Sequence, residues 1–456
     1  MTKLYKFQKK GVRLIEKIGS RALLADDMGL GKTIQALEWI SRNELFPSLV
    51  VCPAALKYNW QREAFQHYQL RSQILEGRKP APSRGLDLPT LTIINYDILQ
   101  PWMDYLDDAC FASLVIDECQ FICNTSAVRT QCTIELGKFI PAVVALSGTP
   151  EENGRPADLW PVLHMLKPKV WSRWDKYARK YCAPRYTRWG WKFDGATNLP
   201  DLHKKLKHKN PKKRVMIRRL KSEVLDQLPD KTRSIIPIHL SKAAMGRYCE
   251  ARDDFIKWLK KTHPKRERKA RRAKRLVQMG YLRRIAATEK MQDVMSWIDV
   301  FHQSDKKIGL FGVHRKILEE YHTAYPKSVL VNGKVTKRKR QRAIDKFLTD
   351  PSCQDFFGQM KACGFGLNLQ STTDTMGFIE LDWTPGRHIQ AEDRFHRIGQ
   401  TSNVTCYYFT AIGTIEEPLC RIIQEKQKNS ISIMDGGNKH ADRLSVLDLL
   451  EQELLK

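Results

Sequence analysis

The stretch ALLADDMGLGKT, residues 22–33, combines an apolar run, two glycines and a GKT tripeptide. Four apolar residues, as in a short buried strand, are followed by a turn with two glycines and then by GKT, which can begin a helix. Glycines let the backbone N–H groups of such a turn point at phosphate oxygens, and the helix N-terminus adds partial positive charge. The order of strand, glycine turn and helix therefore predicts a phosphate-binding loop in an α/β protein.

A second stretch, SLVIDECQF at 113–121, supplies the other half of the expected site. Its apolar run stops at Asp117 and Glu118, and adjacent carboxylates at a strand end suit a metal ion and a water beside a phosphate. Lys32 is predicted to reach the terminal phosphates of a nucleotide, and Thr33 and Asp117 to hold Mg²⁺. Glu118 is predicted to orient and deprotonate the attacking water.

Short apolar runs alternate with helical patterns in two parts of the chain, which predicts two α/β lobes with parallel sheets. Strands of the first series are expected at 22–25, 49–52, 91–95, 114–116 and 143–146. Strands of the second series are expected at 308–312, 328–331, 356–360, 376–381 and 405–410. The predicted domains are a first lobe at 1–240 with a helical insertion at about 165–215, a basic helical linker at 241–297, a second lobe at 298–425 and a helical tail at 426–456.

The chain is strongly basic, with 78 Lys and Arg against 50 Asp and Glu and a formal net charge of +28. Such an excess favours a polyanionic partner, most often nucleic acid. The densest segment, 260–275, has ten Lys or Arg in sixteen positions, although a solvated helix face would explain that run as well. Four tryptophans, 171, 174, 189 and 191, lie among basic residues; core packing is expected for them, and base stacking is the alternative.

The cysteines and the apolar segments indicate the compartment. Eleven cysteines without zinc-site spacing suggest reduced thiols and an intracellular protein, cytoplasmic in a bacterium or virus and nuclear in a eukaryote. The N-terminus has no apolar secretion segment, and no run approaches 18 apolar residues, so no membrane association is expected.

Two later segments are predicted to communicate with the phosphate site. In LSGTP, Ser147 and Thr149 have short hydroxyls suited to sensing the phosphate, although SGT alone is only a turn. In HIQAEDRFHRIGQ at 388–400, a helix would place Gln390, Arg394 and Arg397 on one face. Two arginines there could stabilise charge that develops during phosphoryl transfer, and an ordinary surface helix is the alternative.

Taken in order, these motifs resemble those of the Swi/Snf ATPases, a group of superfamily-two helicases. DDMGLGKT, the acidic strand end, SGTP and QAEDRFHRIGQ follow the family's order. YKFQKKGV at 5–12 looks like its adenine-recognition motif, with Gln8 as the adenine reader. YCAPRYTRWGWKFDGATNLPDLH at 181–203 and MIRRLKSEVLDQLPDKTR at 216–233 resemble the annealing-helicase (HARP-like) branch, and the likeness runs from about residue 5 to about residue 428.

The resemblance implies two tandem RecA-like lobes that bind ATP and Mg²⁺ and use hydrolysis to move on double-stranded or forked DNA. The nucleotide contacts that it implies are Gln8, Asp27, Met28, Gly29, Leu30, Gly31, Lys32 and Thr33. The DNA contacts that it implies are Lys57, Tyr96, Asn368 and Trp383. A strand-separating helicase and a non-catalytic DNA-binding scaffold are the alternatives, and the intact set of Lys32, Asp117, Glu118, Arg394 and Arg397 argues against the scaffold. The sequence is compatible with a monomer and identifies no protein partner.

One departure from the family pattern concerns Gln120, which stands where His is usual. The residue at this position is expected to contact the SGTP segment or the facing lobe and to couple phosphate state to movement. Its amide can donate and accept hydrogen bonds at every pH, whereas histidine titrates near pH 6.5. Catalysis is therefore expected to be retained, with the coupling residues being Gln120, Ser147 and Thr149.

Overall fold

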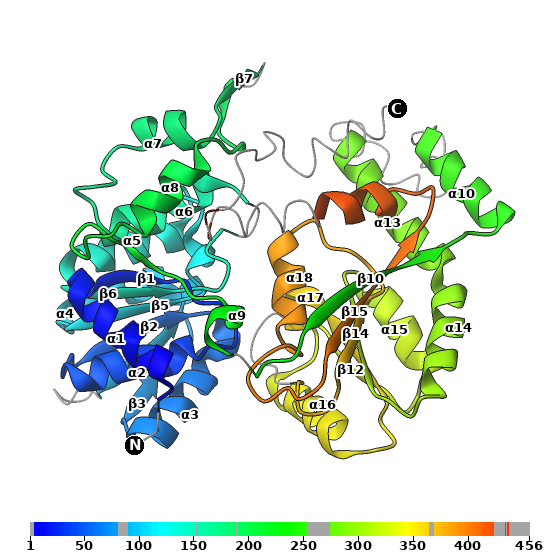
Figure 1. Ribbon diagram of the computed structural model, residues 1–456, viewed down its shortest axis with the longest axis horizontal. Helices are drawn as coiled ribbons and strands as arrows, with labels where there is room; N and C mark the ends of the chain where they lie inside the picture. Colours follow the sequence, from blue (N-terminus) through cyan, green and yellow to red (C-terminus); the bar gives the residue numbers. More distant parts are fainter. Residues whose placement is uncertain are drawn as a thin grey trace. The chain divides into compact units, whose positions relative to one another are not determined.

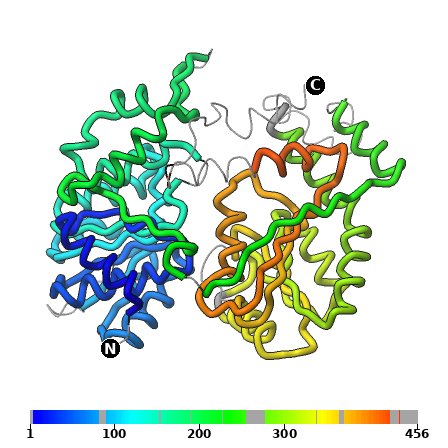
Figure 2. Tube along the Cα trace, viewed as in Figure 1, coloured from blue at the N-terminus to red at the C-terminus, as the bar shows by residue number. Residues whose placement is uncertain are grey.

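A computed structural model describes residues 4–80, 90–151, 154–187, 190–225, 227–253, 274–363 and 369–423, and three single positions beyond these ranges. The described chain forms two compact units, a first that extends to Gln227 and a second that begins at Leu228 (Figures 1 and 2). Each unit has its own sheet and its own hydrophobic core.

The first unit is built on seven parallel strands in the order β3-β4-β2-β5-β6-β1-β9 (Figure 1). Their bounds are β1 (Arg21–Leu24), β2 (Ser48–Cys52), β3 (Ser72–Ile74), β4 (Leu91–Asn95), β5 (Ser113–Asp117), β6 (Ala142–Leu146) and β9 (Met216–Ile217). Every residue of β2, β4, β5 and β6 is buried, as expected for parallel strands covered by helices on both faces. The α-helices are α1 (Lys6–Ile18), α2 (Lys32–Arg42), α3 (Lys57–Tyr68), α4 (Leu99–Asp108), α5 (Val128–Phe139), α6 (Pro156–Leu166), α7 (Trp174–Tyr181), α8 (Leu199–Leu206) and α9 (Lys221–Val224).

The second unit has six parallel strands in the order β10-β15-β14-β11-β13-β12. Their bounds are β10 (Lys231–Ile238), β11 (Ile308–Gly312), β12 (Val329–Val331), β13 (Asp355–Gln359), β14 (Thr375–Phe378) and β15 (Val404–Ala411). The helices are α10 (Lys242–Asp253), α13 (Lys274–Glu289), α14 (Met291–His302), α15 (Arg315–Ala324), α16 (Lys337–Thr349), α17 (Met360–Cys363) and α18 (Pro385–Glu392).

The predicted α/β class with two parallel sheets is confirmed, and a strand lies at each of the ten predicted places. The strands of the two parallel sheets that the sequence did not reveal, β3, β9 and β10, lie at sheet edges. Edge strands can be short, half exposed or interrupted by proline, so they lack a long apolar run. β10 contains Pro237 and pairs with β15 over eight residues, so residues 228–240, assigned from sequence to the first lobe, belong to the second unit.

The segment predicted as a helical insertion contains more than helices. Between α7 and α8 it forms an antiparallel hairpin of β7 (Arg185–Thr187) and β8 (Gly190–Lys192). Trp171 and Trp174 pack against the core of the first unit, as expected, whereas Trp191 is exposed. Most of the basic run at 260–275, Trp189 and nearly all of the tail from 426 lie outside the described residues. Within the described ranges, no helix is both long and apolar enough to cross a membrane.

In the core of the second unit, the ring of Phe395 packs directly against Gly309 of β11. Phe395 is fully buried, and its ring lies edge-on to Phe311 with the centroids 6.0 Å apart. A Cβ added at Gly309 would lie 2.3 Å from Cζ of Phe395, so only glycine lets the ring approach β11 this closely. This contact fixes the chain that follows α18 against the sheet.

We therefore expect Gly309→Ala to destabilise the protein by about 1–3 kcal/mol, because the ring must move out of a filled core. Gly246→Ala is the matched control, since an added Cβ in α10 meets nothing within 4 Å. That change should stabilise by about 0.5–1 kcal/mol through helix propensity. Urea unfolding measures both; equal stabilities for the two variants would contradict the packing argument.

Candidate nucleotide-binding site

Three loops of the first unit meet at one edge of its sheet. The loop at 25–31 follows β1, Asp117 and Glu118 stand at the end of β5, and the SGTP segment (147–150) follows β6. Because β5, β6 and β1 are neighbouring parallel strands, their carboxyl ends lie side by side. Ligands of open α/β sheets bind at this edge.

The conformation of the loop at 25–31, the predicted phosphate loop, depends on Gly31 and Gln8. Gly29 and Gly31 have φ values of 84° and 72°, in the left-handed region, and Gly31 is the residue before α2. A Cβ at Gly31 would lie 2.5 Å from Nε2 of Gln8, which donates a hydrogen bond to the carbonyl of Leu30 at 3.1 Å. Oε1 of Gln8 accepts from the N–H of Tyr5 at 2.9 Å, so the side chain supports the loop from α1.

The Lys32 ammonium lies against the carbonyls of its own loop. Nζ donates to the carbonyl oxygens of Asp26 and Asp27 at 2.8 and 3.2 Å. Desolvation lowers the pKa of Lys32, while the negative charges of Glu118, Asp26, Asp27 and Asp117 oppose that shift. The cation therefore lies within the field of the acidic pair as well as of the loop.

The acidic pair is held from three sides. Trp60 Nε1 donates to Oδ2 of Asp117 at 2.8 Å, the N–H of Glu118 donates to Oδ1 at 3.0 Å, and the hydroxyl of Tyr96 donates to the Asp117 carbonyl at 2.7 Å. Burial raises the pKa of Asp117, and the neighbouring Glu118 raises it further. Glu118 has a φ of 53°, uncommon for a residue with a Cβ and often found at functional sites.

This donor set fits Mg²⁺, because the charge of a desolvated carboxylate beside a second one is best balanced by a cation. Mg²⁺ is usually held by one or two carboxylates together with phosphate oxygens and water. Among the described residues, no group of three or more His, Cys, Asp or Glu could bind a metal without such help. Asp117 and the Thr33 hydroxyl at the start of α2 are the protein groups that would hold the ion.

A chain of hydrogen bonds leads from Glu118 to the SGTP segment. Gln120 Nε2 donates to Oε2 of Glu118 at 2.8 Å, and the Ser147 hydroxyl donates to Oε1 of Gln120 at 2.7 Å. Ser147 Oγ in turn accepts from the N–H of Thr149 at 3.0 Å. The contact expected between Gln120 and this segment is thus present, and it uses both ends of the amide.

Two arginines directly after β9, Arg218 and Arg219, hold the phosphate loop, and the sequence alone did not predict this role. Arg219 pairs with the fully buried carboxylate of Asp26, its Nε lying 2.9 Å from Oδ1, and also donates to the carbonyl of Phe7 and to Gln35 Oε1. Arg218 pairs with Asp27 at 3.0 Å and donates to the carbonyls of Ala25 and Gly148 at 2.9 and 3.2 Å. The sequence signal for this role is the RR of MIRRLKSEV, the segment that resembles the annealing-helicase branch.

Two of the expected DNA contacts lie inside the first unit instead. Lys57 is buried and donates from Nζ to the carbonyl of Leu75 at 2.9 Å. Tyr96 is buried against Phe121 and supports Asp117, as described above. Burial of both side chains argues against direct contact with DNA. Tyr96 instead supports Asp117, and Lys57 holds the chain that follows β3. Asn368 lies outside the described residues.

The predicted helix at 388–400 is wrong beyond residue 392, because α18 ends at Glu392 and a series of turns follows. The N–H groups of Arg394 and Phe395 bond three residues back, to Ala391 and Glu392, as the chain turns to bury Phe395. Arg394 and Arg397 therefore leave from the turns and share no helical face with Gln390. Gln390 is buried, and Trp383 is half-buried with the Arg283 guanidinium 4.4 Å from its ring centroid.

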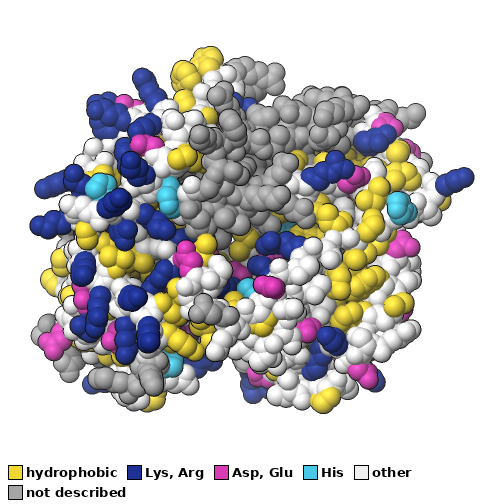
Figure 3. Space-filling model, viewed as in Figure 1, with side chains coloured by type: hydrophobic (Ala, Val, Ile, Leu, Met, Phe, Trp, Pro, Cys, Tyr) yellow, Lys and Arg dark blue, Asp and Glu magenta, His cyan; other side chains and the backbone are white. Residues whose placement is uncertain are grey.

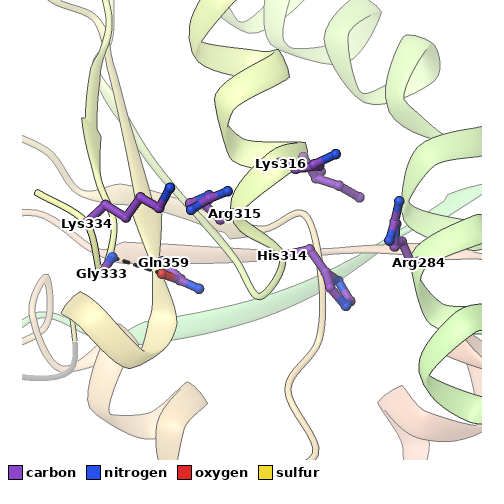
Figure 4. Close-up of a pocket in the computed structure, with 8 residues that line it drawn as sticks. Arg284, His314, Arg315, Lys316, Gly333, Lys334 and Gln359 are labelled. Carbon is purple, nitrogen blue, oxygen red and sulfur yellow. Dashed lines mark hydrogen bonds between the residues drawn. The ribbon is translucent and has the colours of Figure 1, made fainter. Parts of the chain in front are cut away.

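The second unit also contains a basic pocket of about 340 Å³ at the start of α15 (Figure 4). Its described lining has five basic or imidazole side chains and no carboxylate. These residues are Arg284, His314, Arg315, Lys316 and Lys334, with Ile317, Gly333 and Gln359. Gln359 Oε1 accepts from the N–H of Gly333 at 3.0 Å and orders the loop that carries Lys334. Positive charge beside a helix N-terminus suits an anionic group.

Comparison with protein families gives two matches that together extend from residue 7 to 399. Residues 7–292 match the SNF2-related domain, and residues 289–399 match the helicase conserved C-terminal domain. Both matches agree with the predicted resemblance, and they include the site of the first unit and the turns that carry Arg394 and Arg397.

Curated relatives are similar over nearly the whole chain. The Xenopus tropicalis "SWI/SNF-related matrix-associated actin-dependent regulator of chromatin subfamily A-like protein 1" is 34% identical over 93% of this chain and 44% of its own length. The human "DNA annealing helicase and endonuclease ZRANB3" is 31% identical over 95% of this chain and 40% of its own length. The chain thus spans less than half the length of these relatives. A solved "Sulfolobus solfataricus SWI2/SNF2 ATPase core in complex with dsDNA" is 25% identical, with 99% and 96% of the two chains covered and a TM-score of 0.43.

Arg219→Ala should destabilise the first unit by about 3–5 kcal/mol, because it leaves the Asp26 carboxylate buried without its partner. Arg42→Ala, which removes an exposed ion pair with Glu16, is the matched control and should cost about 0.2–1 kcal/mol. Urea unfolding followed by tryptophan fluorescence gives both values. If the two variants lose the same amount, Arg219 does not hold the loop.

Proposed function

The chain belongs to the SNF2-related family, and from this premise we propose that it is a DNA-stimulated ATPase that moves on double-stranded or forked DNA. The observation that carries the proposal is the unbroken hydrogen-bond chain from Glu118 through Gln120 to the SGTP segment, beside an ordered phosphate loop. The net charge of +28 supports a polyanionic partner. The eleven cysteines, none at zinc-site spacing, support an intracellular site of action.

ATP is the proposed substrate, and the first unit would bind it. Gln8 would read the adenine, and the N–H groups of residues 27–33 with the Lys32 ammonium would hold the phosphates. A Mg²⁺ ion held by Thr33 and Asp117 would supply charge neutralisation at the phosphates. Glu118, whose carboxylate is oriented by Gln120, would position a water for attack on the terminal phosphate and accept its proton.

The second unit would contribute positive charge. Arg394 and Arg397 are proposed to stabilise the charge that develops on the terminal phosphate when the two units close around ATP. Buried Gln390 would support the segment that carries them. The basic pocket at the start of α15 and the half-buried Trp383 are proposed to contact the DNA backbone. Unlike the side chains of Lys57 and Tyr96, which are buried, these groups are accessible to a ligand.

A DNA panel tests the proposal. ATP turnover should rise more with duplex or forked DNA than with single-stranded DNA or RNA. The stimulation should fall steeply with salt, since each phosphate neutralised by Lys or Arg releases condensed counterions. Equal stimulation by RNA would point instead to a general strand-separating helicase, and no turnover with any ligand to a non-catalytic scaffold.

Variants along the hydrogen-bond chain should distinguish residues needed for ATP hydrolysis from residues needed for its stimulation by DNA. Glu118→Gln should abolish turnover and still bind ATP. Gln120→Ala should keep basal turnover within about tenfold and lose most DNA stimulation, a coupling of on the order of 1–3 kcal/mol. Gln120→His should retain both, because a neutral imidazole can also donate to Glu118 and accept from Ser147. ATPase rates with and without duplex decide; a Gln120→Ala variant as inactive as Glu118→Gln would assign Gln120 to the chemistry itself.

A further inference from the structure

The hairpin of β7 and β8 carries two large aromatic side chains that the fold leaves in solvent. Tyr186 and Trp191 are opposite each other in the antiparallel register. Their ring centroids are 5.5 Å apart and the planes meet at 73°, while 74% of Tyr186 and 61% of Trp191 are exposed. Two rings in this edge-to-face arrangement form a corner with open faces, which a flat ligand can enter.

The hairpin is anchored at its base, so the exposed rings do not result from loose packing. Phe193, directly after β8, packs edge-on against Trp174 with the centroids 5.6 Å apart. Arg185 and Asp194 form an ion pair at 3.0 Å across the two strand ends. The hairpin thus presents the pair at a fixed place on the first unit, and Figure 1 shows it projecting beyond α7.

The surroundings of the aromatic pair are strongly basic. Residues 174–214 contain thirteen Lys or Arg against three Asp. Lys176, Arg179 and Lys180 on α7 and Lys192 on β8 are exposed. Figure 3 shows hydrophobic side chains gathered at the top of the first unit, over the hairpin, with Lys and Arg side chains on the neighbouring surface. Exposed aromatic rings within positive charge are the combination that binds single-stranded nucleic acid, by stacking on bases and neutralising phosphates.

We propose that Tyr186 and Trp191 form a stacking site for unpaired bases of a forked DNA, with the basic residues around the hairpin holding the backbone of that strand. The inference rests on the proposed function and adds the part of the DNA that the hairpin recognises. Bases in an intact duplex are stacked on one another and hide their faces, so the pair would act only where strands have separated. A protein partner is less suited to this surface, because the large excess of positive charge favours a polyanion.

The competing explanation is that the two rings only stabilise the hairpin, since cross-strand aromatic pairs do so. That role requires only contact between the two rings and does not account for the exposure of their outer faces. The two explanations differ in what substitution does: a stabilising pair can be replaced by β-branched residues of high strand propensity, whereas a stacking site cannot. A variant with Tyr186→Thr and Trp191→Val therefore separates them.

The experiment measures binding of the whole chain to a blunt duplex and to the same duplex with unpaired arms that contain 2-aminopurine. The Thr/Val double variant should bind the blunt duplex within twofold of the parent and the forked DNA about tenfold more weakly, and it should lose the change in 2-aminopurine fluorescence. A Tyr186→Phe, Trp191→Phe variant should bind like the parent. Phe139→Ala, which removes an equally exposed ring from α5, should change neither affinity.

Limited proteolysis of the hairpin in each variant reports whether it is still folded. A folded Thr/Val variant that binds forked DNA like the parent would overturn the proposal, and so would a Phe/Phe variant that binds as weakly as Thr/Val. If the Thr/Val hairpin is cleaved more readily than that of the parent, its weaker binding does not test stacking. The proposal is then tested by the affinity of the folded Phe/Phe variant for forked DNA and by the change in 2-aminopurine fluorescence with the parent. Failure of the proposed function is seen separately, as a parent protein whose ATP turnover does not respond to duplex.

Discussion

The buried ion pair between Asp26 and Arg219 is the interaction on which the candidate site depends. It joins residues 193 positions apart, and through it the phosphate loop is tied to the last strand of the first unit. The general phosphate-loop pattern has glycine where this chain has Asp26, and here the carboxylate of Asp26 pairs with Arg219. Because Arg219 also donates to Phe7 and Gln35, a residue without a carboxylate at 26 would leave a cation unpaired among α1, α2 and β9. Arg218, next to Arg219 in the chain, donates a hydrogen bond to the carbonyl of Gly148 in the SGTP turn. The chain that follows these two arginines leads into the second unit.

The hydrogen bonds from Glu118 to the SGTP turn have a different character, because the two side chains that follow Glu118 are neutral. Gln120 and Ser147 do not titrate near neutral pH, so no change in their own protonation breaks this connection. A histidine in place of Gln120 would add a titrating group to a site where burial has already raised the pKa of Asp117. Glutamine at this position thus links Glu118 to Ser147 without adding a titrating group to the site.

The basic residues of this chain have different roles. Some of it is structural, as in Arg218, Arg219 and Lys57, whose side chains are mostly buried and hold backbone carbonyls or carboxylates. Other basic residues line the pocket at α15, where His314 pairs with Glu380 and Arg315 with Glu319. Others surround the β7–β8 hairpin, where thirteen Lys or Arg stand against three Asp at 174–214. The net charge alone cannot separate these roles, because a guanidinium that closes a loop and one that faces solvent count equally.

The class of fold, the central strands, and the glycine loop with the acidic pair opposite it could all be predicted from the amino-acid sequence. These depend on local patterns: apolar runs of strand length, glycines at the turn, and polar residues at strand ends that parallel pairing brings to one edge. The edge strands β3, β9 and β10, the end of α18 at Glu392, and the burial of Lys57 and Tyr96 became visible only in the folded chain. So did the hold of Arg218 and Arg219 on the loop. Each of these results depends on contacts between residues far apart in the chain, such as Phe395 against Gly309 or Arg219 against Asp26, and no local window of sequence contains both partners.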